Sequence, residues 1–155
     1  MNALFTFPRA TALLLISTLA VGLAYAGKPV KLEEVPQPAV KAVQNRFAKA
    51  TISSVDKETN GDFEFTIKNG EQVLDVGVKA DGTLINIKED IKEDKIPMVV
   101  KEALLKKHPG ATFVETEKVI SIDGKKESVT YELKIKADKT TSEVIFDEDG
   151  KLLGK

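Results

Sequence analysis

An internal repeat is the feature that most constrains how this chain can fold. Residues 35–52 recur as residues 96–113, and each copy opens with an aliphatic residue followed by proline. Further matches follow in the same order, joining residues 63–67 to 131–135 and residues 80–84 to 148–152. Because a repeated segment specifies an architecture, the sequence predicts two similar units in tandem.

A hydrophobic segment precedes the repeats. An apolar run over residues 10–23 ends in Ala24-Tyr25-Ala26. Small residues at Ala24 and Ala26 are typical of a signal peptidase site, so residues 1–26 are predicted to be a signal peptide cleaved before Gly27. A retained anchor is the alternative, but the run is short for a membrane span and no stop-transfer pattern follows it. We therefore expect a periplasmic or secreted protein without a stable membrane anchor.

Charge and cysteine content narrow the partner classes. The sequence has no cysteine, so no disulfide can form and stability must come from burial. Its 23 basic and 24 acidic residues are interspersed along the chain. Nucleic acids and anionic membranes select clustered lysine and arginine instead. We expect no nucleic-acid partner.

Each copy begins with a helical pattern. Apolar residues recur at intervals of four and predict one buried stripe per helix. The stripe residues are Ala39, Val43 and Phe47 in the first copy and Val100, Leu104 and His108 in the second. Pro36 and Pro38 suit the first turn of a helix, where a missing N–H group costs nothing.

After each helix the apolar period changes to two. The first copy contains strand candidates at residues 51–57, 63–68, 71–79 and 83–88. Asn-Gly and Asp-Gly pairs between them predict type I′ hairpin turns, which need positive φ at both central residues. The predicted fold class is therefore α+β, a tandem repeat in which each unit packs one helix on an antiparallel β-meander of about four strands. Each sheet should bury one face and expose the other.

The repeat also sets the domain organisation. Residues 27–34 form a polar lead-in, residues 35–87 the first repeat and residues 96–155 the second. Residues 88–95 alternate acidic and basic side chains around Ile91. This segment is either a docking strip or a charged, solvated connector, and the connector is favoured because mixed charge without apolar periodicity has nothing to bury.

Several short motifs appear in a fixed order. A helix opened by Val35-Pro36 or Ile96-Pro97 is closed, in the second copy, by His108-Pro109-Gly110-Ala111, and hairpins then end in an Asp-Gly turn before a leucine-containing strand. In this the chain resembles the PepSY-like, β-lactamase-inhibitor-like (BLIP-like) family of secreted bacterial proteins, over nearly its whole length after residue 26. The first copy departs from the pattern at residues 47–50.

The resemblance carries expectations of its own. It implies tandem units whose helices cover one face of an antiparallel sheet, in the periplasm or outside the cell. It also implies a role in binding or restraining other proteins, such as peptidases. Its motifs are mainly structural, so they indicate the fold more directly than the function.

The residues offer no catalytic constellation. His108, the single histidine, takes the place of Phe47 in the repeat, which favours packing at the core edge over a role as base or metal ligand. Glycine-rich phosphate loops, paired cysteines and nucleophile-elbow motifs do not occur. The serines fall on predicted strands or their ends, at Ser53, Ser54, Ser121, Ser128 and Ser142. We expect no enzyme activity and no cofactor, and an unrecognised hydrolase is the least favoured hypothesis.

The densest carboxylate group is Asp147-Glu148-Asp149-Gly150, which begins like a calcium loop. It lacks the later spaced ligands and falls where a hairpin turn is required, so turn formation is favoured. A periplasmic protein that binds a small ligand or a divalent cation through Asp147 and Asp149 remains the alternative function.

The favoured function is a non-catalytic binding module that acts on an envelope protein or a peptidase. Hot spots of protein interfaces favour tryptophan, tyrosine and arginine. After residue 26 the chain has no tryptophan, Tyr131 as its tyrosine and Arg46 as its arginine, so weak or charge-guided binding is expected. An ordinary solvated sheet face is the competing interpretation. The candidate partner-binding residues on the exposed sheet face are Glu64, Thr66, Lys68, Asp75, Glu132, Lys134, Lys136 and Glu143.

Overall fold

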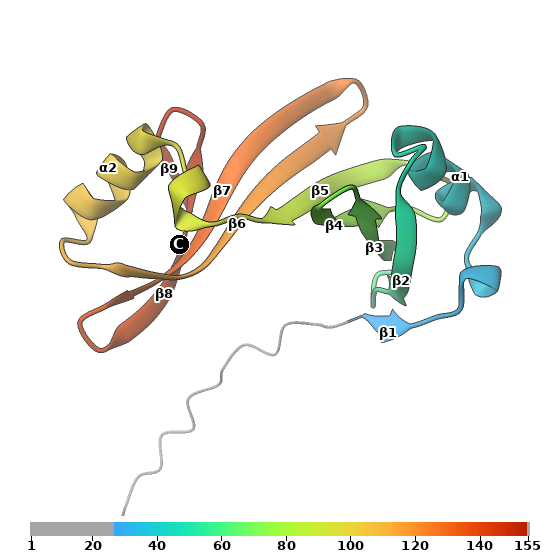
Figure 1. The fold of residues 1–155 in the computed structure, drawn as a ribbon, viewed down its shortest axis with the longest axis horizontal. Helices are drawn as coiled ribbons and strands as arrows, with labels where there is room; N and C mark the ends of the chain where they lie inside the picture. The colour runs from blue at the N-terminus through green and yellow to red at the C-terminus, as the bar shows by residue number, and fades with distance from the viewer. Residues whose placement is uncertain (1–26, 155) are drawn as a thin grey trace, which may run out of the picture.

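The computed structural model describes residues 27–154 of the chain, so the predicted signal peptide, with Ala24 and Ala26, lies outside the described residues. Two α-helices, two short 3-10 helices and one antiparallel sheet make up these residues (Figure 1). The helical elements are η1 (Leu32–Glu34), α1 (Gln37–Arg46), η2 (Glu93–Lys95) and α2 (Met98–Lys107).

Within residues 27–154 nine strands pair in chain order, each antiparallel to the next. The strands are β1 (Lys28–Pro29), β2 (Thr51–Lys57), β3 (Phe63–Asn69), β4 (Gln72–Val78), β5 (Leu84–Asp90), β6 (Thr112–Asp123), β7 (Lys126–Ala137), β8 (Thr140–Asp147) and β9 (Leu152–Gly154). The pairing of β5 with β6 joins the two repeats into one sheet. This confirms the α+β meander and adds that its two halves are continuous.

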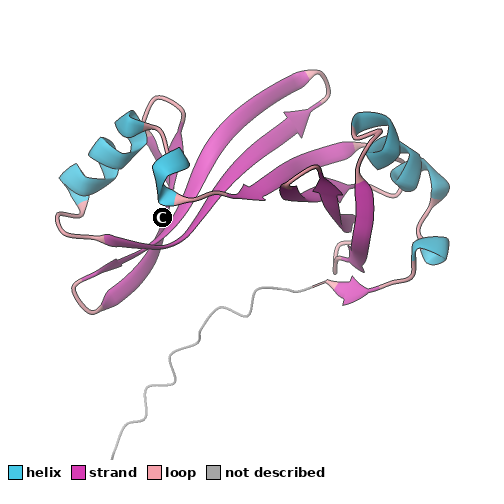
Figure 2. Cartoon of the chain, in the orientation of Figure 1, coloured by secondary structure: helices cyan, strands magenta, loops and turns pink. Residues whose placement is uncertain are grey.

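The two helices cover the same face of the sheet at its two ends (Figure 2). Ile87 of β5 lies directly opposite Ile120 of β6, and both face the core under α1. Two residues before Ile120, Lys118 therefore has the same orientation, and it lies opposite Tyr131 of β7, which belongs to the core under α2. The other face carries no helix, and we call it the helix-free face.

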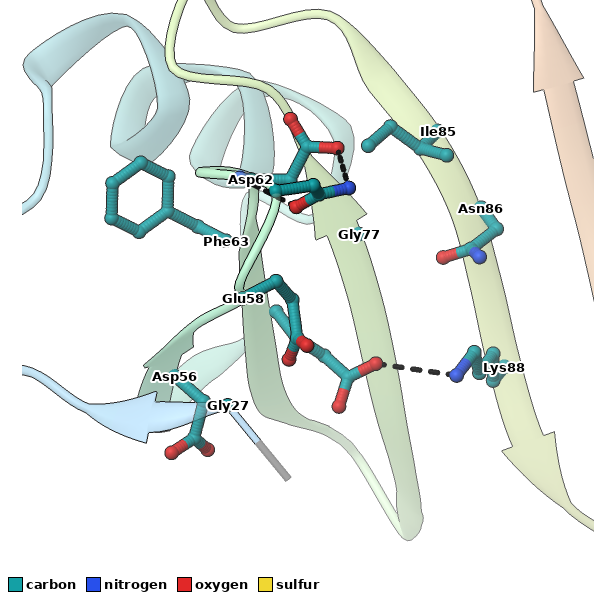
Figure 3. Close-up of a pocket in the computed structure, with 11 residues that line it drawn as sticks. Gly27, Asp56, Glu58, Asp62, Phe63, Gly77, Ile85, Asn86 and Lys88 are labelled. Carbon is teal, nitrogen blue, oxygen red and sulfur yellow. Dashed lines mark hydrogen bonds and ion pairs between the residues drawn. The ribbon is translucent and has the colours of Figure 1, made fainter. Parts of the chain in front are cut away.

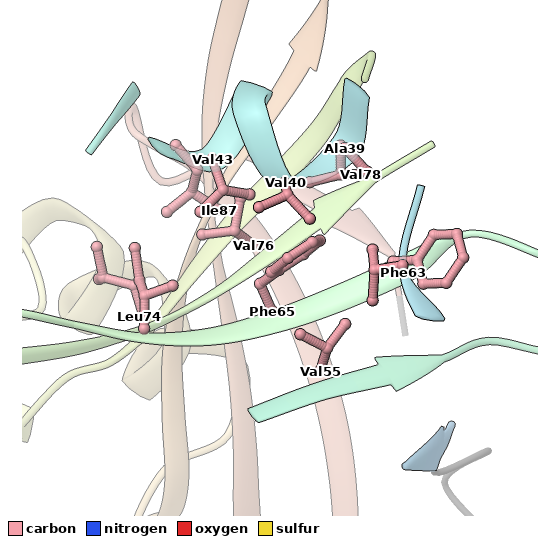
Figure 4. Close-up of a cluster of buried hydrophobic side chains, with 12 residues drawn as sticks. Ala39, Val40, Val43, Val55, Phe63, Phe65, Leu74, Val76, Val78 and Ile87 are labelled. Carbon is pink, nitrogen blue, oxygen red and sulfur yellow. The ribbon is translucent and has the colours of Figure 1, made fainter. Parts of the chain in front are cut away.

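Each helix buries its predicted stripe. Ala39 and Val43 of α1 pack on Phe65 and its neighbours on β3 and β4 (Figure 4). Val100 and Leu104 of α2 are fully buried over β7 and β8. The stripe ends in both cases at the residue after the last helical turn, Phe47 or His108, and these two residues share nearly the same backbone angles.

The Asp-Gly turn of each unit lies against the start of its helix. Gly82 has a φ of 92°, and a Cβ there would lie 2.8 Å from the carbonyl oxygen of Pro38. Gly150 has a φ of 77°, and a Cβ there would lie 2.8 Å from the carbonyl oxygen of Val99. Glycine is needed at both turns because it accepts positive φ and allows close approach of the backbone.

The long β6–β7 hairpin ties the second unit to the first. Ile120 and Ile122 of β6 pack against the core under α1. Near the hairpin tip, Glu127 accepts a hydrogen bond from Arg46 of α1 at 2.9 Å. The core of the first unit is thus completed by residues that belong to the second repeat.

Two local predictions differ from the structure. Lys88, Glu89 and Asp90 begin the predicted connector but belong to β5, because they pair with Val119, Lys118 and Glu117 of β6. Hydrogen bonding across the junction therefore orders the first three residues of the predicted connector, while residues 92–95 are exposed.

The hairpin turns also differ from the predicted type I′ geometry. Gly70 and Gly124 are the first central residues of two-residue loops and have positive φ, whereas Glu71 and Lys125 do not. Positive φ at the first position alone is the pattern of a type II′ turn. Asp138, which begins the loop to β8, adopts the same sign of φ at 53°.

Candidate functional site

The helix-free face brings together the eight residues predicted to bind a partner. Glu64, Thr66 and Lys68 alternate with the buried residues of β3, as the polar residues of β7 do on their strand. Direct cross-strand pairs join Thr66 to Asp75 and Lys134 to Glu143. One polar face therefore extends from the first unit into the second.

A first hollow opens on this face beside β1, with a volume of about 500 Å³ (Figure 3). Glu64 and Lys88 meet in it, with Glu64 Oε2 3.3 Å from Lys88 Nζ. The hollow is lined by Gly27, Asp56, Glu58, Asn60, Asp62, Phe63, Glu64, Gly77, Ile85, Asn86 and Lys88. Four of these side chains are carboxylates and one is a lysine.

Asn86 in the first hollow has an unusual environment. Its Oδ1 atom is buried and has no hydrogen-bond partner among the described residues. A Cβ at residue 77 would lie 2.5 Å from this oxygen, so Gly77 provides the space that it occupies. A buried acceptor without a donor is unfavourable in the free protein.

A second hollow of about 440 Å³ lies further along the same face. It is lined by Asp90, Glu115, Glu117, Glu132, Lys134 and Glu143. Lys134 Nζ donates hydrogen bonds to both carboxylate oxygens of Glu115, at 3.0 and 3.1 Å. The one lysine of the hollow is thus already paired.

Three carboxylates form a row across the junction of the two units. Asp90 of β5 lies directly opposite Glu117 of β6, and Glu117 lies directly opposite Glu132 of β7. We call these three residues the carboxylate row. Like charges on directly opposed strand positions destabilise a sheet. The row is therefore unfavourable for the free protein.

Burial is the main cause that raises the pKa of Glu117, and the carboxylates of Glu132, Asp90 and Asp75 add to it against the opposing effect of Lys88. Burial also raises the pKa of Glu132, with Glu143 adding and Lys88 opposing.

Lys88 lines the first hollow, two residues before Asp90 of the second hollow on the same strand, β5. Its partial burial alone would lower its pKa, but Glu64, Glu117 and Glu132 outweigh this and raise the pKa of Lys88. Lys88 therefore stays protonated, and one cation is shared by several carboxylates.

The other sequence candidates lie elsewhere. His108 follows the last turn of α2, and its Nε2 atom is buried without a hydrogen-bond partner among the described residues. The Asp147 carboxylate accepts hydrogen bonds from the backbone N–H groups of Asp149 and Lys151, as a turn residue does. Residues 27–154 contain no group of three or more histidine, aspartate or glutamate side chains placed so that they could hold a metal ion. None of the helices described is long and apolar enough to cross a membrane.

Sequence reasoning missed most of the residues that line the two hollows, among them Lys88, Asp90, Glu115 and Glu117. Asp90 was placed in the connector, and Lys88 at the end of the strand candidate 83–88 and the start of the connector. Glu115 and Glu117 alternate with Thr116 and Lys118 on β6 and could have been found from this period of two. Their meeting with Asp90 depends on the β5–β6 pairing, for which the sequence has no local signal.

No protein-family model and no curated protein matches the chain by sequence. Solved structures do match it. A DUF2874 family protein from Bacteroides ovatus superposes with a TM-score of 0.68 and 13% identity, covering 77% of this chain and 84% of that one. A BLIP-like protein from Bacteroides fragilis superposes with a TM-score of 0.63 and 14% identity, covering 76% and 82%. The chain has the BLIP-like fold.

A third structure of the same fold comes from Bacteroides eggerthii and is provisionally described as periplasmic. It matches with a TM-score of 0.65 and 11% identity over 77% of this chain and 86% of that one. None of these three proteins is named as an enzyme. At such low identity the likeness concerns the BLIP-like fold alone. It confirms, for the fold, the resemblance to the BLIP-like family that the sequence indicated.

Proposed function

We propose that this chain is a non-catalytic binding module of the periplasm or the cell exterior, which docks an envelope protein on its helix-free face. The carboxylate row carries the proposal. Directly opposed like charges weaken the sheet that holds them. Features that disfavour folding concentrate at functional sites, so contact with a partner accounts for a row that folding does not.

The location is supported by two observations. The N-terminal segment has the residues of a signal peptidase site before Gly27. The Bacteroides eggerthii protein with the same fold is provisionally described as periplasmic. Mass spectrometry of the protein from the producing cells should find a chain that starts at Gly27, and a full-length chain in the membrane fraction would contradict export.

Charge, rather than aromatic anchoring, fits the binding mode. Tyr131 is 7% exposed and belongs to the core under α2. Arg46, the one arginine of residues 27–154, lies on α1 and pairs with Glu127. The helix-free face therefore has neither residue type that dominates tight interfaces, and its complementarity to a partner is electrostatic. Restraint of a peptidase is one activity that such docking provides.

A charge-reversal pair tests the docking surface. Glu132→Lys changes the carboxylate row, whereas Glu102→Lys makes the same change at an exposed position of α2. Both variants and the parent serve as bait for periplasmic extract. A partner retained by the parent and by Glu102→Lys but lost with Glu132→Lys supports docking on the face. If the Glu132→Lys bait retains every partner, the helix-free face is not the site. A captured peptidase is then assayed with and without the module.

A further inference from the structure

We infer that the segment docked on the helix-free face is basic, an extended stretch of partner protein rich in arginine and lysine that lies along the carboxylate row. The inference rests on the proposed function and specifies the chemistry of its partner. Cationic side chains of this segment enter the two hollows.

The first support is a local imbalance of charge. The two hollows are lined by nine carboxylates and two lysines, while the whole chain has a net charge of −1. The negative charge is therefore concentrated in the two hollows and balanced elsewhere, in part by Lys68 and Lys136 of the same face. The carboxylates are Asp56, Glu58, Asp62, Glu64, Asp90, Glu115, Glu117, Glu132 and Glu143. Such a face attracts cations and repels acidic proteins.

The second support is that the two lysines of the hollows already have partners. Lys88 pairs with Glu64 and Lys134 pairs with Glu115. Within residues 27–154, Glu117 and Glu132 form no ion pair. Their partial burial and mutual repulsion make the negative charge costly, and a cation from outside would relieve that cost. A basic partner would therefore gain binding energy by neutralising Glu117 and Glu132, and a neutral or acidic partner would not.

The third support is independent of charge. Asn86 lines the first hollow, and its Oδ1 atom is buried without a donor among the described residues. Gly77 leaves the space in which this oxygen sits. The Asn86 residue as a whole is partly exposed, so a shift of its side chain would bring the amide to the hollow, where N–H groups of a guanidinium or ammonium can satisfy it. The first hollow therefore suits a side chain rich in hydrogen-bond donors, which its carboxylates also favour.

The dimensions favour a peptide over a metal ion. Neighbouring strands lie about 4.8 Å apart, so the row extends about 10 Å across three strands. Side chains on one side of an extended peptide recur about every 6.6 Å, which lets alternate basic residues follow the row. A single ion needs ligands that converge, and residues 27–154 contain no group of three or more that could hold one.

Arginine suits this surface better than lysine does. Its planar guanidinium bonds carboxylates in a two-point geometry and loses less hydration than an ammonium on transfer to a partly buried site. Glu117 and Glu132 lie directly opposite each other, so one guanidinium between them contacts both carboxylates. Peptides with arginine at alternate positions should therefore bind more tightly than their lysine counterparts.

The experiment measures fluorescence anisotropy of a labelled peptide in which arginine alternates with serine. A matched peptide carries citrulline, which keeps the shape and removes the charge. We expect the purified protein to bind the arginine peptide, with affinity that falls as salt rises. The double variant Glu117→Gln/Glu132→Gln should bind at least about tenfold more weakly, since two charged hydrogen-bonding partners are lost. Glu102→Gln, on the opposite face, should bind as the parent does.

Several outcomes would overturn the inference. Equal binding of the arginine and citrulline peptides would show that charge is not recognised. Unchanged arginine-peptide binding by the double variant would place the contact elsewhere. Saturable calcium binding that this variant loses, without peptide binding by the parent, would make the face an ion site. The double variant should fold, because its substitutions remove repulsion, and circular dichroism checks this.

The failure of this inference is distinguishable from failure of the docking function. A neutral or acidic partner that the parent captures and Glu132→Lys loses, together with no arginine-peptide binding, leaves docking intact and overturns the basic partner. If Glu132→Lys retains every partner and binds the arginine peptide as tightly as the parent does, both the docking function and the basic partner are overturned.

Discussion

Glu117 of β6 and Glu132 of β7 lie directly opposite each other on the helix-free face, at the junction of the two units. Asp90 extends the row on one side, and Lys88 is the cation that both glutamates share. Opposite charges or apolar pairs on opposed strand positions stabilise a sheet, whereas like charges destabilise it. The same carboxylates that lower the stability of the free protein therefore form the surface that we propose for partner recognition.

The first prediction is that neutralising either glutamate stabilises the free protein. The folded pKa values of Glu117 and Glu132 lie above the ordinary value of 4.5. The folded state therefore holds these protons more tightly, so their stabilisation is present below about pH 4.5 and is lost as pH rises through the raised values. Glu117→Gln and Glu132→Gln should each raise the free energy of unfolding at pH 7 by roughly 0.2 to 1 kcal/mol.

Urea unfolding of these variants between pH 4 and pH 8 checks the prediction. The groups around the pair, Lys88, Asp75, Asp90 and Glu143, are unchanged in both variants. Stability should fall less between acid and neutral pH in each variant than in the parent. Glu102→Gln on α2 is the control, with no change expected. A glutamine variant less stable than the parent at pH 7 would contradict the repulsion argued for the row.

The second prediction concerns the helix stripes. Leu104→Ala should lower the free energy of unfolding by about 2 to 5 kcal/mol, because a fully buried side chain leaves a cavity. Val43→Ala, at the equivalent place under α1, should cost less because fewer atoms are removed. Lys106→Ala, exposed on α2, should stay within about 0.5 kcal/mol. Equal effects of all three in urea melts would contradict helix packing on the sheet.

The third prediction concerns His108, whose backbone conformation repeats that of Phe47. Its Nε2 atom is buried and lacks a partner among the described residues, which leaves a polar atom unsatisfied. His108→Phe should therefore be neutral or stabilising, with any loss below about 1.5 kcal/mol. Thermal melts measure this, and arginine-peptide binding should be unchanged. Loss of binding in a stable His108→Phe variant would make His108 part of a site.

The fourth prediction concerns the two Asp-Gly turns. Gly82→Ala should destabilise through positive φ and through a Cβ 2.8 Å from the Pro38 carbonyl oxygen. Gly61→Ala is the matched control, because its φ is 90° but no atom lies within 4 Å of the added Cβ. Strain at positive φ costs about 1 kcal/mol or more, and Gly82→Ala should exceed Gly61→Ala. Equal losses in urea unfolding would show that the helix contact is unimportant.

The elements of the fold follow from the sequence because their signals are local. Periods of four and two, with glycine at the turns, predict α1, α2 and the hairpins to within a few residues. The hairpin turns depart from type I′ because positive φ falls on the glycine and not on the preceding Asn69 or Asp123. A dipeptide signal predicts that the chain turns there but does not define which residues are central.

The site was predictable in part. Alternation on β3 and β7 placed Glu64 and Glu132 on an exposed face, and the structure has them there. The carboxylate row was not predictable, since it forms where β5 pairs with β6 across the helical segment that contains α2. From composition alone, Asp90 was predicted to belong to the connector between the repeats. Pairing between strands that are distant in sequence depends on the packing of the whole sheet, which a single chain segment does not encode.

The last prediction is that the two repeats unfold as one cooperative unit. Ile120 belongs to the second repeat but packs against the core of the first, and the β5–β6 pairing makes the sheet continuous. Ile120→Ala should therefore lower the stability of both units together, by about 2 kcal/mol since the side chain is partly buried.

Tyr131, the one tyrosine of residues 27–154, reports the second core through its fluorescence, while far-ultraviolet circular dichroism reports the whole sheet. The two signals should give coincident urea transitions in the parent and, at lower urea, in the variant. Leu105→Ala, at an exposed position of α2, is the control and should leave both transitions in place. Separate transitions in the parent, or a shift confined to one signal in Ile120→Ala, would show that the units fold independently and that the junction bearing the carboxylate row is only a contact between two domains.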